Sequence, residues 1–316
     1  AQRADPILYS AAILISLAEV FFYAISWRTL LNYLYVKISV IKSYLFVWYG
    51  IFLDIIIPAE SISGEVCRIY LVTREQSGTS GKVVASLVTH RLLGMGINVA
   101  ALVMGISLLL GETQINDLIF NLILFFTVAI VAILLLFIVL SFKENLSLKV
   151  INALIRLGDF LSRGKWKLFN KLKEEVYRSE KMFHDSMQEY RHKPQALVTS
   201  LFFLALNWTC SLSIPYIVFL SLGFPISWGV VLITSAIVVA VKSIPIGVPF
   251  EVGLPEITMT TLYVGLGVPG DISATATILS RIITLWLRFF IGFLAQQWLE
   301  LKPLLISSNS ATPEKT

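Results

Sequence analysis

The chain has 316 residues, of which 56% are hydrophobic and only 14% are charged, and its mean hydropathy is +0.79. These values exclude a single soluble domain and predict an all-α protein that crosses a membrane several times. The net charge of +5 is concentrated in loops beside apolar segments, which is typical of a positive-inside bias, so no nucleic-acid partner is expected.

The first membrane half is expected over residues 1–141 and begins with an apolar segment, Pro6–Trp27. This segment lacks a positively charged start and a small-residue cleavage site, so we expect a retained span rather than a cleaved signal. The loop after it carries Arg28, Lys37 and Lys42 and should therefore be cytoplasmic.

Two short segments, joined at Pro58, follow between residues 44 and 74. Each is too short for a full crossing, which needs about 20 apolar residues. Because positive charge flanks both ends, the pattern predicts a re-entrant hairpin that enters and leaves on the cytoplasmic side. Pro58 and Gly64 are the expected breaks in this hairpin.

Two longer apolar segments, Val83–Leu110 and Leu118–Ser141, complete the first half, and each should span the membrane. The loop between them carries only the acidic residues Glu112 and Asp117, so we expect it outside.

Residues 142–193 form a polar linker in which lysine and arginine outnumber aspartate and glutamate by twelve to seven. Apolar residues recur in it mostly at intervals of three or four, which predicts an amphipathic helix over residues 164–193. This helix either lies on anionic lipid head groups or caps the helix bundle. The apolar positions are Trp166, Phe169, Leu172, Val176, Phe183, Met187 and Tyr190.

The second membrane half is expected over residues 194–300 and starts with a span over Gln195–Leu222. A second re-entrant hairpin over residues 228–267 should open from the outside, because the turn before it is uncharged. The stretch Lys242–Glu256 interrupts this apolar region, and such a break is tolerated only where protein or water surrounds it. The expected breaks are Pro245, Gly247, Pro249 and Gly253.

A last span over Ile272–Trp298 contains Arg281 and Arg288, and a polar tail over residues 301–316 follows it. The alternation of sides places this tail, like the linker, in the cytoplasm of a multi-pass plasma-membrane protein.

The two halves share a pattern of spacings. Pro58 lies seven residues before Glu65, which lies twenty-six before Arg91. Pro249 lies seven before Glu256, which lies twenty-five before Arg281. Because the two hairpins open to opposite sides, the pattern predicts an inverted-topology repeat, as in many secondary transporters.

Five short motifs in this order resemble those of the lysylphosphatidylglycerol synthase transmembrane region, also called the flippase-like or UPF0104 family. The resemblance covers nearly the whole chain and implies a membrane domain that moves a lipid or lipid-linked substrate between leaflets. We expect no counterpart of the soluble aminoacyltransferase that is joined to this domain in the best-known members, so the resemblance does not imply aminoacylation. The motifs are Pro58-x5-Gly64-Glu65-x2-Arg68-x-Tyr70, Ala85-Ser86-x4-Arg91, Pro245-x7-Gly253-x2-Glu256, Gly267 and Arg281.

Three features depart from the family pattern. His90 stands where an acidic residue often precedes the arginine, and Glu251 occupies a position that is frequently glycine. The usual first span of the family is expected to be missing before Pro6.

Charges within apolar segments are costly and need partners or water, so we treat them as candidate site residues. We expect a cytoplasmic-side cluster of Glu65, Arg68 and Arg91 and an external-side cluster of Lys242, Glu256 and Arg281. In the functional interpretation, arginine binds a lipid phosphate, glutamate holds the arginine when the site is empty, and helix N-termini at the breaks face the same anion. In the structural alternative, each glutamate–arginine pair only pins its hairpin.

Glu19, Asp54 and Glu60 are weaker candidates, which fit either proton coupling or a simple polar contact. Cys67 and Cys210 have no metal-ligand spacing and are expected to be buried, inert thiols. Metal, nucleophile and nucleotide-binding motifs are not found, so no cofactor is expected.

Three functions are therefore considered. The first is a flippase-like transporter of an anionic phospholipid or a polyprenyl-phosphate-linked lipid, as a homo-oligomer or with a separate synthase partner. The second is a non-transporting scaffold or receptor subunit that holds a partner through the 164–193 helix. An intramembrane lipid-modifying enzyme ranks last, so we expect no enzyme.

Overall fold

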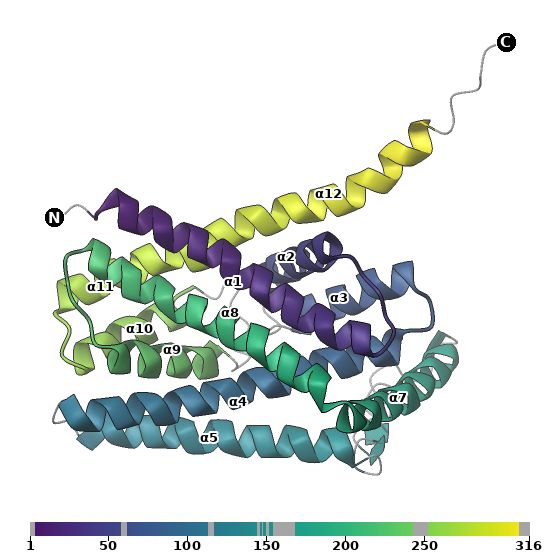
Figure 1. Cartoon of the computed structure of the whole chain (residues 1–316), viewed down its shortest axis with the longest axis horizontal. Helices are drawn as coiled ribbons and strands as arrows, with labels where there is room; N and C mark the ends of the chain where they lie inside the picture. The colour runs from purple at the N-terminus through teal and green to yellow at the C-terminus, as the bar shows by residue number, and fades with distance from the viewer. Residues whose placement is uncertain are drawn as a thin grey trace.

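The computed structural model describes residues 4–57, 62–112, 117–143, 146, 148–149, 152–153, 168–242 and 252–309, and this part of the chain consists of helices joined by short turns (Figure 1). The helices are α1 (Pro6–Tyr33), α2 (Val40–Ile56), α3 (Ile62–Glu75), α4 (Ser80–Glu112), α5 (Asp117–Phe142), α7 (Leu168–His192), α8 (Pro194–Ser221), α9 (Trp228–Lys242), α10 (Leu254–Gly265), α11 (Gly270–Arg281), the π-helix η2 (Ile282–Leu287) and α12 (Arg288–Asn309).

Five helical segments of the described chain are long and apolar enough to cross a membrane. They are Pro6–Tyr33, Ser80–Leu108, Leu124–Ser141, Pro194–Ser221 and Gly270–Leu301. All five coincide with the long spans predicted from the sequence. The prediction of a polytopic α-helical membrane protein is thereby confirmed at the level of helix length and composition.

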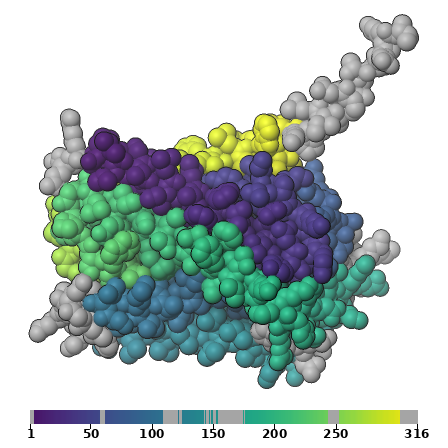
Figure 2. Space-filling view, in the orientation of Figure 1, coloured from purple at the N-terminus to yellow at the C-terminus, as the bar shows by residue number. Residues whose placement is uncertain are grey.

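The helices α1 and α8 pack side by side along their whole length and run in opposite directions (Figure 1). Asp5 N–H, at the start of α1, donates to Ser221 O at the end of α8 (2.8 Å), and Ser26 Oγ donates to Ser200 O nearer their other ends (2.8 Å). Small buried side chains at this contact let the two helix axes approach closely. The antiparallel pair crosses the face of the molecule turned to the viewer in Figure 2, above the blue and teal atoms of α4 and α5.

The short helices form two pairs, α2 with α3 and α9 with α10. Gly64, which the sequence predicted as a break, lies instead in the first turn of α3. A Cβ at this position would lie 2.6 Å from Gly50 O of α2, so glycine is needed because two helices meet there. Gly253 does mark a break: it precedes α10 with φ +103°, a conformation that favours glycine. Pro58, Pro245, Gly247 and Pro249 lie outside the described residues.

Two main hydrophobic clusters hold the bundle together. One joins α1, α2, α3 and the start of α4 around Trp27, Phe46 and Trp48. The other joins α8, α9, α10 and α11 with part of α4 around Phe219 and Tyr263. Cys67 is buried in the first cluster and Cys210 is half-buried in α8, and neither forms a disulfide.

The predicted amphipathic helix is present as α7 and packs against its own bundle. Met187 and Tyr190 are buried against α1, α4 and α8, and the Tyr190 hydroxyl donates to Leu30 O (2.9 Å). A third small cluster forms there, so the C-terminal half of α7 caps the bundle. Farther toward its start, Val176 and Tyr177 are exposed.

We predict that Tyr190→Phe lowers the free energy of unfolding by about 1 kcal/mol, because a buried hydroxyl bond is lost without a change in ring packing. Tyr177→Phe in the same helix is the matched control and should change stability little, since Tyr177 is 40% exposed and the hydrogen bond of its hydroxyl to Asn152 is open to water, which can replace it. Unfolding of both variants in detergent micelles measures the difference. Equal stability of the two variants would contradict the capping role of Tyr190.

The last helix extends farther than expected. The sequence predicted a polar tail from residue 301, whereas α12 continues to Asn309. A fall in hydropathy after Trp298 ends the apolar span but does not end the helix, because hydropathy and helix propensity are separate properties.

Candidate functional site

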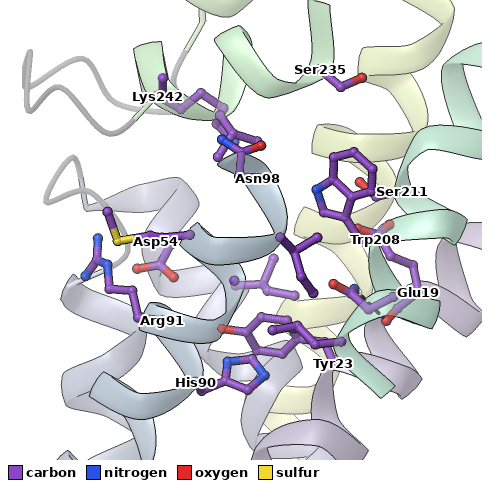
Figure 3. A pocket seen from close by; sticks show the side chains of 18 of the residues that line it. Glu19, Tyr23, Asp54, His90, Arg91, Asn98, Trp208, Ser211, Ser235 and Lys242 are labelled. Atoms are coloured by element: carbon purple, nitrogen blue, oxygen red, sulfur yellow. Dashed lines mark hydrogen bonds between the residues drawn. The ribbon is translucent and has the colours of Figure 1, made fainter. Parts of the chain in front are cut away.

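A cavity of about 670 Å³ lies between the two main hydrophobic clusters and is lined by residues of both membrane halves (Figure 3). Its walls come from α1, α2, α3, α4, α5, α8, α9, the end of α11, η2 and α12. The volume falls within the range of small-molecule sites. Of the six head-group residues predicted from the sequence, five line this cavity: Glu65, Arg68, Arg91, Lys242 and Arg281.

The first predicted glutamate–arginine pair is formed. Arg91 Nη1 of α4 lies 3.3 Å from Glu65 Oε1 of α3, and both side chains are half-buried. The contact ties the short helix α3 to the long helix α4. Asp54 of α2 holds the other side of α3, since its Oδ1 accepts hydrogen bonds from Ser63 Oγ and Gly64 N–H (2.7 Å each).

The second predicted pair is also formed, between α10 and the end of α11. Arg281 Nε donates to Glu256 Oε1 at 2.5 Å, and Arg281 is buried. Glu256 Oε2 also accepts from Gly253 N–H (2.7 Å), so one carboxylate both caps α10 and holds the arginine. Lys242, at the end of α9, lines the cavity from above Asn98 in Figure 3.

The helix N-termini do not face an open anion site as expected. The backbone N–H of Gly64 near the start of α3 donates to Asp54, and that of Gly253 before α10 donates to Glu256. A carboxylate at a helix N-terminus accepts hydrogen bonds from backbone N–H groups that have no partner within the helix, and it interacts favourably with the positive end of the helix dipole. These two helix ends therefore already hold an anion from the chain itself.

A third ion pair, which the sequence did not predict as a pair, joins Glu19 of α1 to Arg288 of α12. Both residues line the cavity, and Glu19 is buried. Glu19 was a weaker candidate, and Arg288 was assigned no role. The sequence does contain a signal for Arg288, which lies seven residues after Arg281. Residues seven apart share a helix face, so Arg288 should face the same site as Arg281.

The two arginines of the last span flank the π-helix η2, Ile282–Leu287. Arg281, Thr284, Leu285 and Arg288 from this region all line the cavity. Single π-turns within α-helices are rare and occur frequently at functional sites. The altered winding sets how the two guanidinium groups point relative to each other.

Several uncharged polar side chains of the cavity were not predicted as site residues. Tyr23 and His90 lie edge to face (ring centroids 4.5 Å apart) at the lower end of the cavity in Figure 3. His90 Nε2 and Asn98 Oδ1 are buried and have no hydrogen-bond partner among the described residues. Such groups are costly to leave unpaired, and they are available to a ligand.

The wall formed by α5 is entirely apolar and comprises Phe125, Phe126, Ala129, Ile130 and Ile133. On the same helix, Phe125 and Ile133 are also exposed at the molecular surface. The cavity therefore combines charged groups on most walls with one hydrocarbon wall at the edge of the bundle, where α5 lies beside α4 (Figures 1 and 2). This combination suits an amphipathic ligand.

Comparison with known proteins agrees with the resemblance seen in the motifs. The sequence model of the family described as "Lysylphosphatidylglycerol synthase TM region" matches residues 1–292. The chain belongs to this family. It is similar to a UPF0104 membrane protein of Pyrococcus horikoshii, with 26% identity over 98% of this chain and 91% of the relative. A UPF0104 membrane protein of Methanocaldococcus jannaschii is 22% identical over 85% of this chain and 78% of the relative. No solved structure matches significantly.

Family membership and the five spans together identify a multi-pass membrane protein. In this member of the lysylphosphatidylglycerol synthase TM-region family, Glu65, Arg68, Arg91 and Arg281 lie around one cavity rather than in two separate clusters. Glu256 does not line the cavity itself but forms an ion pair with Arg281, which does. Glu60 and Glu251 lie outside the described residues.

Proposed function

We propose that this protein moves an anionic lipid, or a lipid-linked anionic substrate, between the two leaflets of a membrane. The observation that carries the proposal is one cavity that is lined both by arginines from the two membrane halves and by the hydrocarbon wall of α5. A phosphate needs the charge-assisted, bidentate contacts that arginine provides, and acyl chains need an apolar surface.

In the proposed cycle, the ion pairs of the empty cavity keep its cations in place. Glu65 holds Arg91, Glu256 holds Arg281 and Glu19 holds Arg288 until an anionic head group replaces the carboxylate. This exchange leaves none of these three arginines without a counter-ion, which avoids the cost of an uncompensated cation in an apolar environment.

The proposal includes the inverted repeat and two re-entrant hairpins. The antiparallel contact of α1 and α8, the first long helices of the two halves, supports the inversion. The short pairs α2–α3 and α9–α10 support the hairpins, since their 17, 14, 15 and 12 residues are fewer than a full crossing needs. Movement of one half against the other would then expose the cavity to each side in turn.

We further infer a plasma-membrane location with the C-terminus and residues 142–193 in the cytoplasm, and a transport rather than an enzymatic role. The substrate class is a phospholipid or a polyprenyl-phosphate-linked lipid, and nucleic acid is no partner. A homo-oligomer or a separate synthase partner is compatible with this role. The scaffold alternative is less well supported, because α7 uses Met187 and Tyr190 within its own bundle.

The test is transport of fluorescent phosphatidylglycerol in reconstituted vesicles. We expect Arg91→Ala and Arg281→Ala each to slow the movement at least about tenfold, as loss of one charge-assisted contact predicts. Arg74→Ala is the control, since Arg74 bridges to Glu300 outside the cavity (3.6 Å). Unchanged movement in both cavity variants would refute the proposal.

A further inference from the structure

Among the cavity arginines, Arg68 differs from the other three. Arg91, Arg281 and Arg288 each form an ion pair with a glutamate, whereas Arg68 forms no ion pair with a carboxylate among the described residues. It is nevertheless only 5% exposed. Glu65 and Asp54 act on Arg68 only through longer-range electrostatic attraction, so its guanidinium has no direct counter-ion within the described ranges, and an anion bound at this point would supply one.

Neutral groups alone position the Arg68 guanidinium. Its Nε donates to Gly64 O (3.3 Å) and its Nη1 donates to the Tyr23 hydroxyl (3.2 Å). The rings of Tyr23 and Trp27 lie 5.5 and 5.4 Å from its Cζ. These contacts orient the cation without neutralising it.

His90 adds an independent indication of a ligand at the same place. It is 3% exposed, lines the cavity and stacks edge to face on Tyr23, and its Nε2 has no partner in the described part of the chain. In the neutral ring, Nε2 carries a proton in one of the two tautomers and can then donate it. The Tyr23 hydroxyl, which accepts from Arg68, retains its own proton for donation.

We propose that Tyr23, Arg68 and His90 form the subsite that binds the phosphate group of the transported ligand. Arg68 supplies the charge, while Tyr23 and His90 supply neutral hydrogen bonds from α1 and α4. The ligand enters this subsite without displacing a glutamate, so it is the first anchor, and the paired arginines engage later. The inference rests on the proposed function for the lipid nature of the ligand, but the subsite is testable separately.

The experiment is a binding titration of the purified full chain with three probes: short-chain phosphatidylglycerol, glycerol 3-phosphate and inorganic phosphate. We expect Arg68→Gln to weaken binding of the short-chain lipid by about tenfold or more, and Tyr23→Phe and His90→Phe by about threefold to tenfold each. Tyr23→Phe retains the ring packing, and His90→Phe keeps an aromatic ring, although a larger one, against Tyr23, so the two variants test the subsite even if Arg68→Gln does not fold. Arg74→Gln, on the same helix but outside the cavity, should bind as the wild type does.

The outcomes separate the two proposals. Wild-type affinity in folded Tyr23→Phe and His90→Phe, or no saturable binding of any probe, would overturn the subsite. Lipid binding at least tenfold tighter than that of glycerol 3-phosphate supports a lipid ligand at this subsite. If inorganic phosphate binds as tightly as the lipid and both depend on Arg68, the subsite stands and the lipid-transport proposal fails.

Discussion

Replacement of Arg288 by methionine should lower the free energy of unfolding by about 3 kcal/mol, because it leaves the buried carboxylate of Glu19 without its counter-ion. The pair links residues 269 positions apart, so its loss also removes a direct contact between α1 and α12. Methionine matches the length of the arginine stem and fills the space with apolar atoms. Unfolding by detergent titration in mixed micelles measures the change.

The double variant Glu19→Gln with Arg288→Met is the decisive control. It removes both charges, so most of the lost stability should return, since replacement of a buried pair by neutral groups is often close to neutral. A double variant as unstable as the sum of the single variants would show that the two residues do not act as a pair.

Gly64→Ala should be the most damaging single-methyl substitution in α3, with a loss of about 2 to 3 kcal/mol of unfolding free energy. The added Cβ would lie 2.3 Å from Asp54 Oδ2 and 2.6 Å from Gly50 O. The carboxylate can rotate away, but it then loses its bond to the Gly64 N–H, and the Gly50 backbone cannot move without shifting α2. We also expect lipid binding to weaken, since Arg68 Nε contacts Gly64 O.

Gly96→Ala in α4 is the matched control for this prediction. Among the described residues, no heavy atom outside the backbone of the helix itself lies within 4 Å of the added methyl group at that position. Alanine is favoured over glycine in a helix by about 1 kcal/mol. Stability should therefore stay constant or rise. A Gly64→Ala variant as stable as Gly96→Ala would contradict the close α2–α3 contact.

The long helices were predictable from the sequence because a predominantly apolar run of about 20 residues has few alternatives to a span. The α7 helix was predictable for a similar reason, since its apolar period of three to four residues specifies one buried face. The surface that this face contacts was not predictable. Anionic lipid and the protein bundle both bind such a face, and only the fold brings Leu30 to Tyr190.

The ion pairs of the site were predictable where both partners belong to the same membrane half. The Glu65–Arg91 and Glu256–Arg281 pairs followed from matched spacings within each half. The Glu19–Arg288 pair was not predictable, because nothing local relates the first helix to the last. The expected anion sites at helix N-termini were wrong for a different reason: Asp54 and Glu256 already cap these ends, and a sequence does not reveal which carboxylate a helix end recruits.

The central claim is that one charged cavity carries an anionic lipid across the membrane, and its most direct test is lipid movement by the unmodified protein. Vesicles that contain trace fluorescent phosphatidylglycerol, with and without the reconstituted chain, are treated with a membrane-impermeant quencher. The account predicts that fluorescence of the inner leaflet becomes accessible to the quencher only when the protein is present, and faster than for a zwitterionic analogue. Quenching that stops at the outer leaflet in both samples would contradict it.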